Sequence, residues 1–184
     1  MVKLNYVEPL RKKKVIRDIL TYLRNKNERD YMLFLMGVHT GLRISDLLRL
    51  RVRDVKDRSH ITLIEKKTKK QRKILINKEL KLELKQYCKD KQHYEFLFQS
   101  RNGGNNPISR VRAYQILYEV GEVFGIHVSC HTLRKTFGYI HYKANNDVVY
   151  LMEIFNHATP KITLRYIGVM QDELDKSTAD MSFL

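Results

Sequence analysis

The chain has 184 residues, of which 43% are hydrophobic and 30% are charged, as in an ordinary soluble globular domain. It contains no apolar run near the roughly 20 residues that span a bilayer and no export signal, so we expect a cytoplasmic protein without membrane contact. Lys and Arg outnumber Asp and Glu by 35 to 20, and the net charge of +15 favours a polyanion, most commonly nucleic acid, as partner.

Hydrophobic periodicity predicts three helices in the first quarter of the chain, over residues 12–26, over residues 28–39, and a short one through Asp46. The second is apolar nearly all round and should lie in the core. Gly41 is suited to the left-handed position that ends it. Arg43 follows at once, between apolar helices, where a cation is costly to bury without an anion. Its partner is either an anionic ligand or a buried carboxylate such as Asp46.

Alternating apolar and polar residues predict a small three-stranded antiparallel sheet over residues 51–56, 60–65 and 72–77. The turn between the last two strands is strongly basic, since six of the nine residues from Glu65 to Lys73 are Lys or Arg. Such a tip either contacts phosphates or a groove of DNA, or is a solvated turn whose lysines protect the sheet edge. The sequence leaves both readings open.

Further helices are predicted over residues 78–90, 109–124, 132–143 and 147–155, and another begins at Thr159-Pro160 and runs to Tyr166. A loop covers residues 100–107. The fold class is therefore α+β, mostly α-helical, with a small three-stranded antiparallel sheet. Residues 171–184 form an acidic tail that packs on its own domain or on a neighbour, or frays; its apolar points are Leu174, Met181, Phe183 and Leu184.

His131 and Arg134 are three residues apart, which places them on one face of a helix. A guanidinium and an imidazole that converge in a basic protein suggest an anionic ligand, and phosphate first. The sequence has no HxxxH or CxxC spacing for a metal, no glycine-rich phosphate loop and no GxSxG. What remains is a set of cations, imidazoles and one tyrosine suited to metal-free phosphoryl transfer from DNA: Arg43, Lys67, His131, Arg134, His157 and Tyr166.

These residues occur in boxes that resemble the tyrosine recombinases (the phage integrase family), and the resemblance covers essentially the whole chain. The first box reads TGLRISDL from Thr40 to Leu47, and the basic hairpin reads KTKKQR from Lys67 to Arg72. The second box is HTLR from His131 to Arg134, and the last runs from Asn156-His157 to Tyr166. No single box is specific, but their order and spacing together are.

The resemblance implies a role for each matched residue. Tyr166 would attack the scissile phosphate and form a 3′-phosphotyrosyl link, and Arg43, Arg134 and His157 would bind the phosphate oxygens. Lys67 would protonate the 5′ oxygen, and His131 would support proton transfer. Asp46 would orient Arg43. The other hairpin cations, expected to bind DNA, are Lys66, Lys69, Lys70 and Arg72. The implied enzyme is a site-specific recombinase that needs no cofactor, no metal and no ATP.

The same resemblance implies double-stranded DNA as partner, with the protein a monomer in solution and a homotetramer on DNA. Three departures stand out. Asp46 replaces the usual Glu, and Asn156 replaces the usual Gly but tolerates the left-handed conformation. The third is the N-terminal DNA-clamping domain that family members usually carry, which we expect to be absent here. We expect a catalytic domain over residues 1–170 and a tail over 171–184 that docks on the next protomer. Two alternatives are a DNA-binding regulatory module that recombines nothing by itself and a type IB topoisomerase.

Overall fold

The computed structural model describes residues 7–179 and residue 181, and the expected apolar points Phe183 and Leu184 lie outside the described residues. Its elements follow one another in the order α1 (Lys13–Lys26), α2 (Glu28–Thr40), α3 (Ile44–Leu47), η1 (Val52–Asp54), β1 (His60–Ile64), β2 (Gln71–Leu75), α4 (Lys78–Tyr87), α5 (Arg110–Phe124), α6 (Cys130–Asn145), α7 (Val148–Phe155), α8 (Pro160–Tyr166) and α9 (Val169–Ala179). The expected mostly helical α+β fold is confirmed.

The sheet differs from the expectation, because it has two strands and not three in the part of the chain that the structure describes. β1 and β2 pair antiparallel, with Ile61 opposite Ile74. The segment expected as the first strand, residues 51–56, instead contains the 3-10 turn η1, at whose start Asp54 accepts a hydrogen bond from the Arg51 backbone at 2.8 Å. Val52 and Val55 are both buried. They are three residues apart, a spacing that places both on one face of a helical turn but on opposite faces of a strand.

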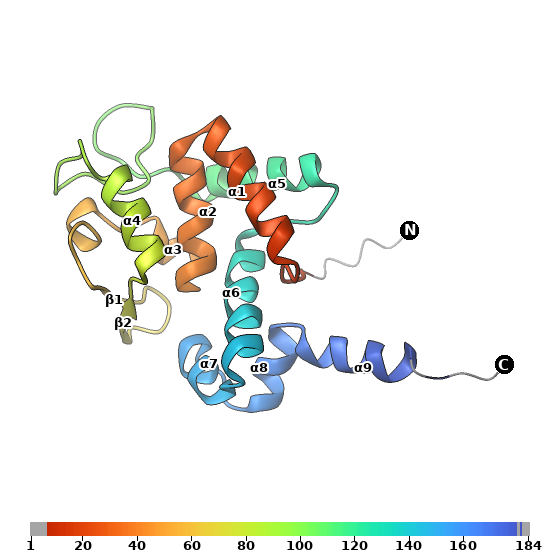
Figure 1. The fold of residues 1–184 in the computed structure, drawn as a ribbon. Coiled ribbons are helices and arrows are strands. Elements are labelled where there is room, and N and C mark those ends of the chain that lie inside the picture. The colour runs from red at the N-terminus through yellow and green to blue at the C-terminus, as the bar shows by residue number, and fades with distance from the viewer. Residues whose placement is uncertain (1–6, 180, 182–184) are drawn as a thin grey trace.

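Helix α6 connects the two parts of the core. The larger hydrophobic cluster, which contains α2 and α4, includes Leu133 of α6. A smaller cluster is made by residues of α7, α8 and the start of α9, and Phe137 and Tyr139 of α6 pack against it. In Figure 1, α6 accordingly runs from the region beneath α2 and α5 down to α7 and α8. Side chains that sit along α6 can therefore reach the ends of several other helices.

The local sequence sets where the last helices begin. Thr159 caps α8 by accepting a hydrogen bond from the backbone of Ile162 at 3.3 Å, and Pro160 occupies the first turn, as the sequence predicted. α7 ends at Asn156, which is left-handed with φ 57°. The left-handed turn expected at this position is thus confirmed, although Asn stands where the resembled family usually has Gly.

The segment after Tyr166 forms a helix that the sequence pattern did not reveal. Gly168, with φ +83°, separates α8 from α9. The Asp172 carboxylate on α9 accepts hydrogen bonds from Nε of Arg11 at 2.7 Å and from the hydroxyl of Tyr139 at 2.8 Å. The first part of the tail thus packs on its own chain. Among the described residues, none of the helices has the length and apolar character needed to cross a membrane.

Gly41, which ends α2, provides a stability prediction. Its φ is +59°, and a Cβ built on it would meet the ring of Phe137 on α6. We expect Gly41→Ala to lower the free energy of unfolding by roughly 2–5 kcal/mol, the sum of left-handed strain and overpacking. Gly125→Ala is the matched control, because Gly125 has φ +62° with nothing within 4 Å, and should cost only about 1 kcal/mol. Equal losses in urea titrations of both variants would contradict the packing argument.

Candidate active site

Arg134 is buried, with 4% of its surface exposed, and holds three helices together. From α6 it donates one hydrogen bond to the carbonyl of Gly41, at the end of α2, and another to the carbonyl of Ile154 in α7, at 3.1 Å. Its guanidinium lies 4.7 Å from the centre of the Phe155 ring. A guanidinium has five N–H donors, so others remain for a ligand. Burial lowers the pKa of Arg134 to about 10, which keeps it charged at neutral pH.

Arg43 faces a carboxylate that the sequence analysis did not single out. Its Nη1 lies 2.8 Å from Oε2 of Glu65, although the two groups are not aligned as a hydrogen bond. Glu65 is almost fully buried, and Oε2 also accepts a hydrogen bond from the Thr68 hydroxyl at 2.5 Å. Burial alone would raise the pKa of Glu65, but Thr68 and Arg43 outweigh it and hold the pKa below its usual value. Glu65 is therefore a carboxylate at neutral pH.

Asp46, the residue expected to orient Arg43, has a different direct partner. Its Oδ1 accepts a hydrogen bond from the backbone N–H of Lys66 at 2.9 Å, and Asp46 is buried. Asp46 thus fixes the start of the basic hairpin turn to α3. An orienting effect on Arg43 would pass through that turn and Glu65 rather than through a direct ion pair.

Tyr166 is the last residue of α8, and its ring packs between other site residues. The ring centroids of Phe155 and His157 each lie 5.1 Å from that of Tyr166, in edge-to-face arrangements. The ammonium of Lys135 lies 5.1 Å from the centre of the same ring. Burial raises the pKa of the Tyr166 hydroxyl, while the positive charge and a hydrogen bond of Arg134 act in the opposite direction. The Tyr166 ring and the Arg134 guanidinium both pack against the ring of Phe155.

His157 is held by the helix that carries Tyr166. Its Nδ1 lies 3.1 Å from the hydroxyl oxygen of Thr163, one turn before Tyr166 on α8. Burial, with smaller contributions from Arg134 and Arg43, lowers the pKa of His157. The ring is accordingly neutral at pH 7, with one nitrogen that donates and one that accepts.

His131 and Lys67 are exposed, unlike the buried Arg134. His131 is exposed in the first turn of α6. Partial burial of the ring and the positive charges of Arg134, Lys135 and Arg43 lower its pKa. Lys67 is exposed in the turn between β1 and β2. Lys67 is thus on the surface, two residues after Glu65 in the chain.

The hairpin cations divide into two groups. Lys70 donates to the side-chain oxygen of Asn156 at 2.6 Å, and Arg72 donates to the backbone carbonyl of Glu153 at 3.1 Å. Both contacts attach the hairpin to the end of α7. Lys66 and Lys69 are exposed, and Lys69 is left-handed with φ 59°. Two of the four cations expected to bind DNA therefore also have a structural contact.

The turn at Asn156 provides a second stability prediction. We expect Asn156→Ala to lower the free energy of unfolding by about 1–2 kcal/mol, because Ala tolerates the left-handed conformation less well than Asn. Asn146, which ends α6 with φ 52°, is the matched control. Asn146→Ala should cost about the same, because the Lys70 contact of Asn156 is exposed and contributes only about 0.5 kcal/mol. In urea titrations, a neutral Asn156→Ala would contradict this account.

The charges of the cluster favour an anion. The positive charges of Arg134 and Arg43 act on each other and on Tyr166 and His157. The buried carboxylate of Glu65 lies beside Arg43. Positive charge therefore exceeds negative charge in a partly dry site, where an unbalanced cation is costly. A phosphate placed between the two guanidinium groups would balance it, and it would lie next to the Tyr166 hydroxyl. The arrangement suits attack by a phenol on a clamped phosphate.

Sequence reasoning missed Glu65, Phe155 and Thr163 as members of the cluster. A signal for Glu65 was available. Ile61, Leu63 and Glu65 are two residues apart, so on a strand they share one face, and Ile61 is fully buried. A carboxylate that continues a buried face needs a cationic partner. Phe155 and Thr163 carried no comparable signal, because an apolar residue and a helical Thr are ordinary in a core.

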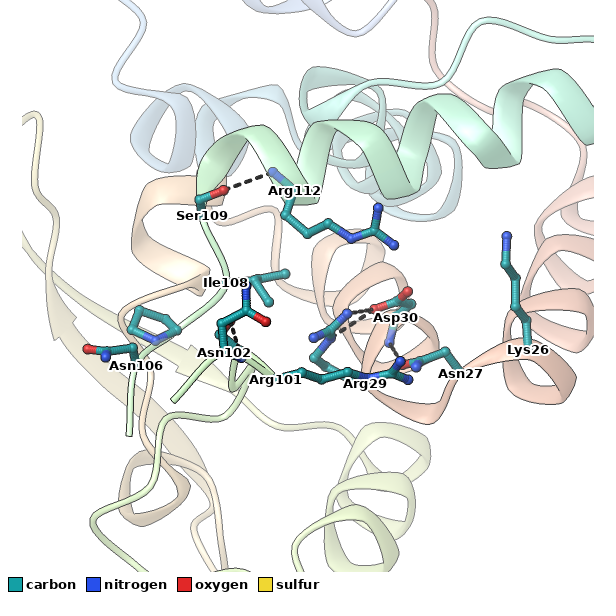
Figure 2. A pocket seen from close by; sticks show the side chains of 12 residues that line it. Lys26, Asn27, Arg29, Asp30, Arg101, Asn102, Asn106, Ile108, Ser109 and Arg112 are labelled. Atoms are coloured by element: carbon teal, nitrogen blue, oxygen red, sulfur yellow. Dashed lines mark hydrogen bonds and ion pairs between the residues drawn. The ribbon is translucent and has the colours of Figure 1, made fainter. Parts of the chain in front are cut away.

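One cavity of about 650 Å³ lies away from these residues. Figure 2 shows Arg29 and Asp30 at its centre, with Arg112 and Arg101 around them. It opens at the N-terminal ends of α2 and α5, whereas Arg134 binds the other end of α2. Thirteen helical residues, at about 1.5 Å each, separate the two ends by about 20 Å. The cavity therefore takes no part in the cluster around Tyr166. Within the described residues, no three of His, Cys, Asp and Glu gather as a metal site would require.

Comparisons with known proteins identify the family of the chain. A family model described as "Phage integrase family" matches residues 10–173. The chain is 46% identical over 170 residues to the probable integrase/recombinase YoeC of Bacillus subtilis (strain 168), covering 92% of this chain and 93% of that protein. Among solved structures, the XerA recombinase superposes with a TM-score of 0.72 at 19% identity, over 99% of this chain and 68% of that one.

A second solved structure is the XerH site-specific recombinase bound to palindromic difH substrate, in a post-cleavage complex. Its TM-score is 0.70 at 16% identity, with 96% of this chain and 54% of that chain covered. The two structural likenesses show the shared fold. The chain spans 93% of YoeC, but only 68% of the XerA chain and 54% of the XerH chain.

Proposed function

Because the chain belongs to the phage integrase family of tyrosine recombinases, whose characteristic reaction is DNA cleavage and rejoining, we propose that it is a site-specific recombinase acting through Tyr166 on double-stranded DNA. The observation that supports this proposal is the buried Arg134 bound to Gly41 and Ile154, a fixed cation that packs on the same Phe155 ring as Tyr166. The family resemblance supplies the reaction, and this cluster supplies the residues.

The oxygen of Tyr166 attacks the scissile phosphorus, forming a P–O bond to the tyrosine while the bond from phosphorus to the 5′ oxygen breaks. Lys67 gives its proton to the departing 5′ oxygen, and neutral His131 takes the proton that the tyrosine hydroxyl loses. The product is a 3′-phosphotyrosyl link and a free 5′ hydroxyl. Rejoining is the reverse step with another 5′ hydroxyl, so the bond energy is conserved without ATP.

The two arginines that would form the phosphate clamp, Arg43 and Arg134, act through their positive charge. Arg43 and Arg134 bind the non-bridging oxygens of the phosphate, and His157 adds a neutral hydrogen-bond donor. These groups are fixed before the substrate arrives, and fixed donors contribute most where charge builds up in the transition state. Lys66, Lys69, Lys70 and Arg72 extend the positive surface along the hairpin toward neighbouring phosphates. No metal or cofactor takes part in the proposed steps.

We also propose the larger assembly that the family resemblance implies, a monomer in solution and a homotetramer on DNA, in the cytoplasm where the DNA substrate lies. Residues 1–170 would form the catalytic unit, and residues 171–184 would dock on the next protomer. Asp172 holds Arg11 and Tyr139 of its own chain, so docking of the tail on a neighbour would have to replace those hydrogen bonds.

A covalent selection tests the proposal without knowledge of the target site. The protein is incubated with nicked duplexes that carry a randomised arm, the mixture is denatured, and DNA that remains attached to protein is recovered and sequenced. The nick lets the short 5′-hydroxyl fragment diffuse away, so a cleaved complex cannot rejoin. We expect enrichment of a defined sequence with attachment at a 3′ end. Binding without any covalent product would contradict the proposal and favour a DNA-binding module.

A further inference from the structure

We propose that Glu65 is a positioning residue that ties the phosphate-binding Arg43 to the turn that carries Lys67. The proposal rests on the roles proposed above for those two residues. Neither role requires a carboxylate. A negative charge beside a phosphate site opposes binding of the substrate, so the presence of Glu65 requires an explanation. The contacts of Glu65 give that explanation, since they extend in two directions.

One direction leads to the phosphate clamp. Oε2 of Glu65 lies 2.8 Å from Nη1 of Arg43, with only 3% of the Glu65 side chain exposed against 21% of the Arg43 side chain. The contact uses one edge of the guanidinium and leaves the other donors of Arg43 for a ligand. A long, flexible side chain would otherwise sample many rotamers, and fixing it before the substrate arrives lowers the entropy cost of binding.

The other direction leads to the hairpin turn. The Thr68 hydroxyl donates to Glu65 Oε2 at 2.5 Å. The Glu65 backbone N–H donates to the carbonyl of Lys70, and its carbonyl accepts from the N–H of Lys69, each at 3.0 Å. Lys67 lies inside the loop that these bonds close. One carboxylate oxygen thus contacts both Arg43 and the turn, and a shift of Glu65 would move the clamp and the proton donor together.

The two carboxylates near this turn also have unused hydrogen-bond acceptors. Among buried side-chain atoms in the described residues, Oε1 of Glu65 and Oδ2 of Asp46 accept no hydrogen bond. Asp46 holds the turn at the adjacent residue through the backbone of Lys66. Two buried carboxylates therefore fix the same turn, one through its backbone and the other through Thr68. A turn held this firmly is needed if a single exposed lysine is to meet one 5′ oxygen.

A substrate whose leaving group needs no proton donor tests whether Glu65 positions Lys67. Nicked duplexes enriched by the selection above are made with the ordinary 5′ oxygen or with sulfur in its place at the scissile phosphate. A thiolate leaves without protonation, because a thiol is far more acidic than an alcohol. We expect Glu65→Gln to slow covalent attachment roughly 10–100-fold on the oxygen substrate, as misplaced groups do, and clearly less on the sulfur substrate. The loss of rate that remains on the sulfur substrate measures how much Glu65 contributes through the position of Arg43.

Thr68→Val removes only the hydroxyl that bonds to Glu65. We expect a smaller loss on the oxygen substrate and full recovery on the sulfur substrate. Glu83→Gln is the matched control, because Glu83 pairs with Arg24 on the surface, and should change neither rate. An equal loss of Glu65→Gln on both substrates would overturn the tie to Lys67. A rate equal to or above wild type would overturn the positioning role, the faster rate meaning that Glu65 obstructs Arg43.

Folding is checked by circular dichroism. If Glu65→Gln does not fold, Thr68→Val decides, and the absence of any loss on the oxygen substrate overturns the proposal. Lys67→Ala separates this inference from the proposed function. The attachment rate that this variant loses on the oxygen substrate should be restored on the sulfur substrate. If wild type attaches to DNA but Glu65→Gln matches it, only the inference fails. If wild type attaches to neither substrate, the proposed function fails and this inference fails with it.

Discussion

Replacement of Tyr166 by Phe is expected to remove covalent attachment to DNA, by more than roughly 10³-fold, because a phenyl ring has no oxygen to attack phosphorus. The ring contacts with Phe155 and His157 would be kept, so the free energy of unfolding should fall by no more than about 1 kcal/mol. Binding of the enriched DNA, measured at fixed salt by fluorescence anisotropy, should change little, since Arg43 and Arg134 remain.

Tyr150→Phe is the control for this experiment. Tyr150 is exposed on α7 and stacks on His141 with 4.5 Å between ring centroids. Its loss of a hydroxyl is chemically the same change outside the cluster, and attachment should continue at the wild-type rate. Attachment that persists in Tyr166→Phe would show that another residue is the nucleophile. The role assigned to Tyr166 would then be wrong.

Arg134→Lys is expected to reduce the rate of attachment roughly 10²–10³-fold, the usual cost of losing one preorganised donor at a transition state. Lys keeps the charge but not the planar fork. One ammonium cannot replace hydrogen bonds to both Gly41 and Ile154, which belong to different helices. A buried carbonyl left without a donor costs about 1–3 kcal/mol, so the free energy of unfolding should fall by about that amount.

Arg165→Lys is the matched substitution for Arg134→Lys. Arg165 is exposed and directly precedes Tyr166, so it tests whether any Arg-to-Lys change near the nucleophile has the same effect. We expect no change in stability and less than about a threefold change in rate. Single-turnover rates and urea titrations give the two readings. An Arg134→Lys variant with the wild-type rate would contradict the clamp, whatever its stability.

The helices were predictable because apolar periodicity dominates them. α2, which is buried on all sides, and α8, with its Thr159 cap, lie where the pattern placed them. The third strand was predicted wrongly because Val52 and Val55 fit an alternating pattern only loosely, while their spacing of three suits a 3-10 turn stabilised by Asp54. α9 was missed because only Val169 in it is buried, so it has no apolar stripe.

The cluster around Tyr166 was predicted as a set of residues but not as a set of contacts. Family-like boxes named Arg43, Arg134, His157 and Tyr166, and the structure brings these four together. The pairing of Arg43 with Glu65, however, depends on how the β1–β2 hairpin lies against α3, which is a tertiary arrangement. Short-range patterns record the face on which Glu65 lies but not which cation meets it. The same holds for Lys70 on Asn156, which are 86 residues apart in the chain.

The attachment site itself is the most direct test of the account. Wild-type protein is trapped on the enriched nicked duplex, the DNA is digested with nuclease, and the peptides are sequenced by mass spectrometry. We expect the residual nucleotide to lie on the peptide containing Tyr166, joined through a 3′-phosphate to the tyrosine oxygen. A nucleotide on any other residue, or a trapped complex joined through a 5′-phosphate, would contradict the proposed mechanism.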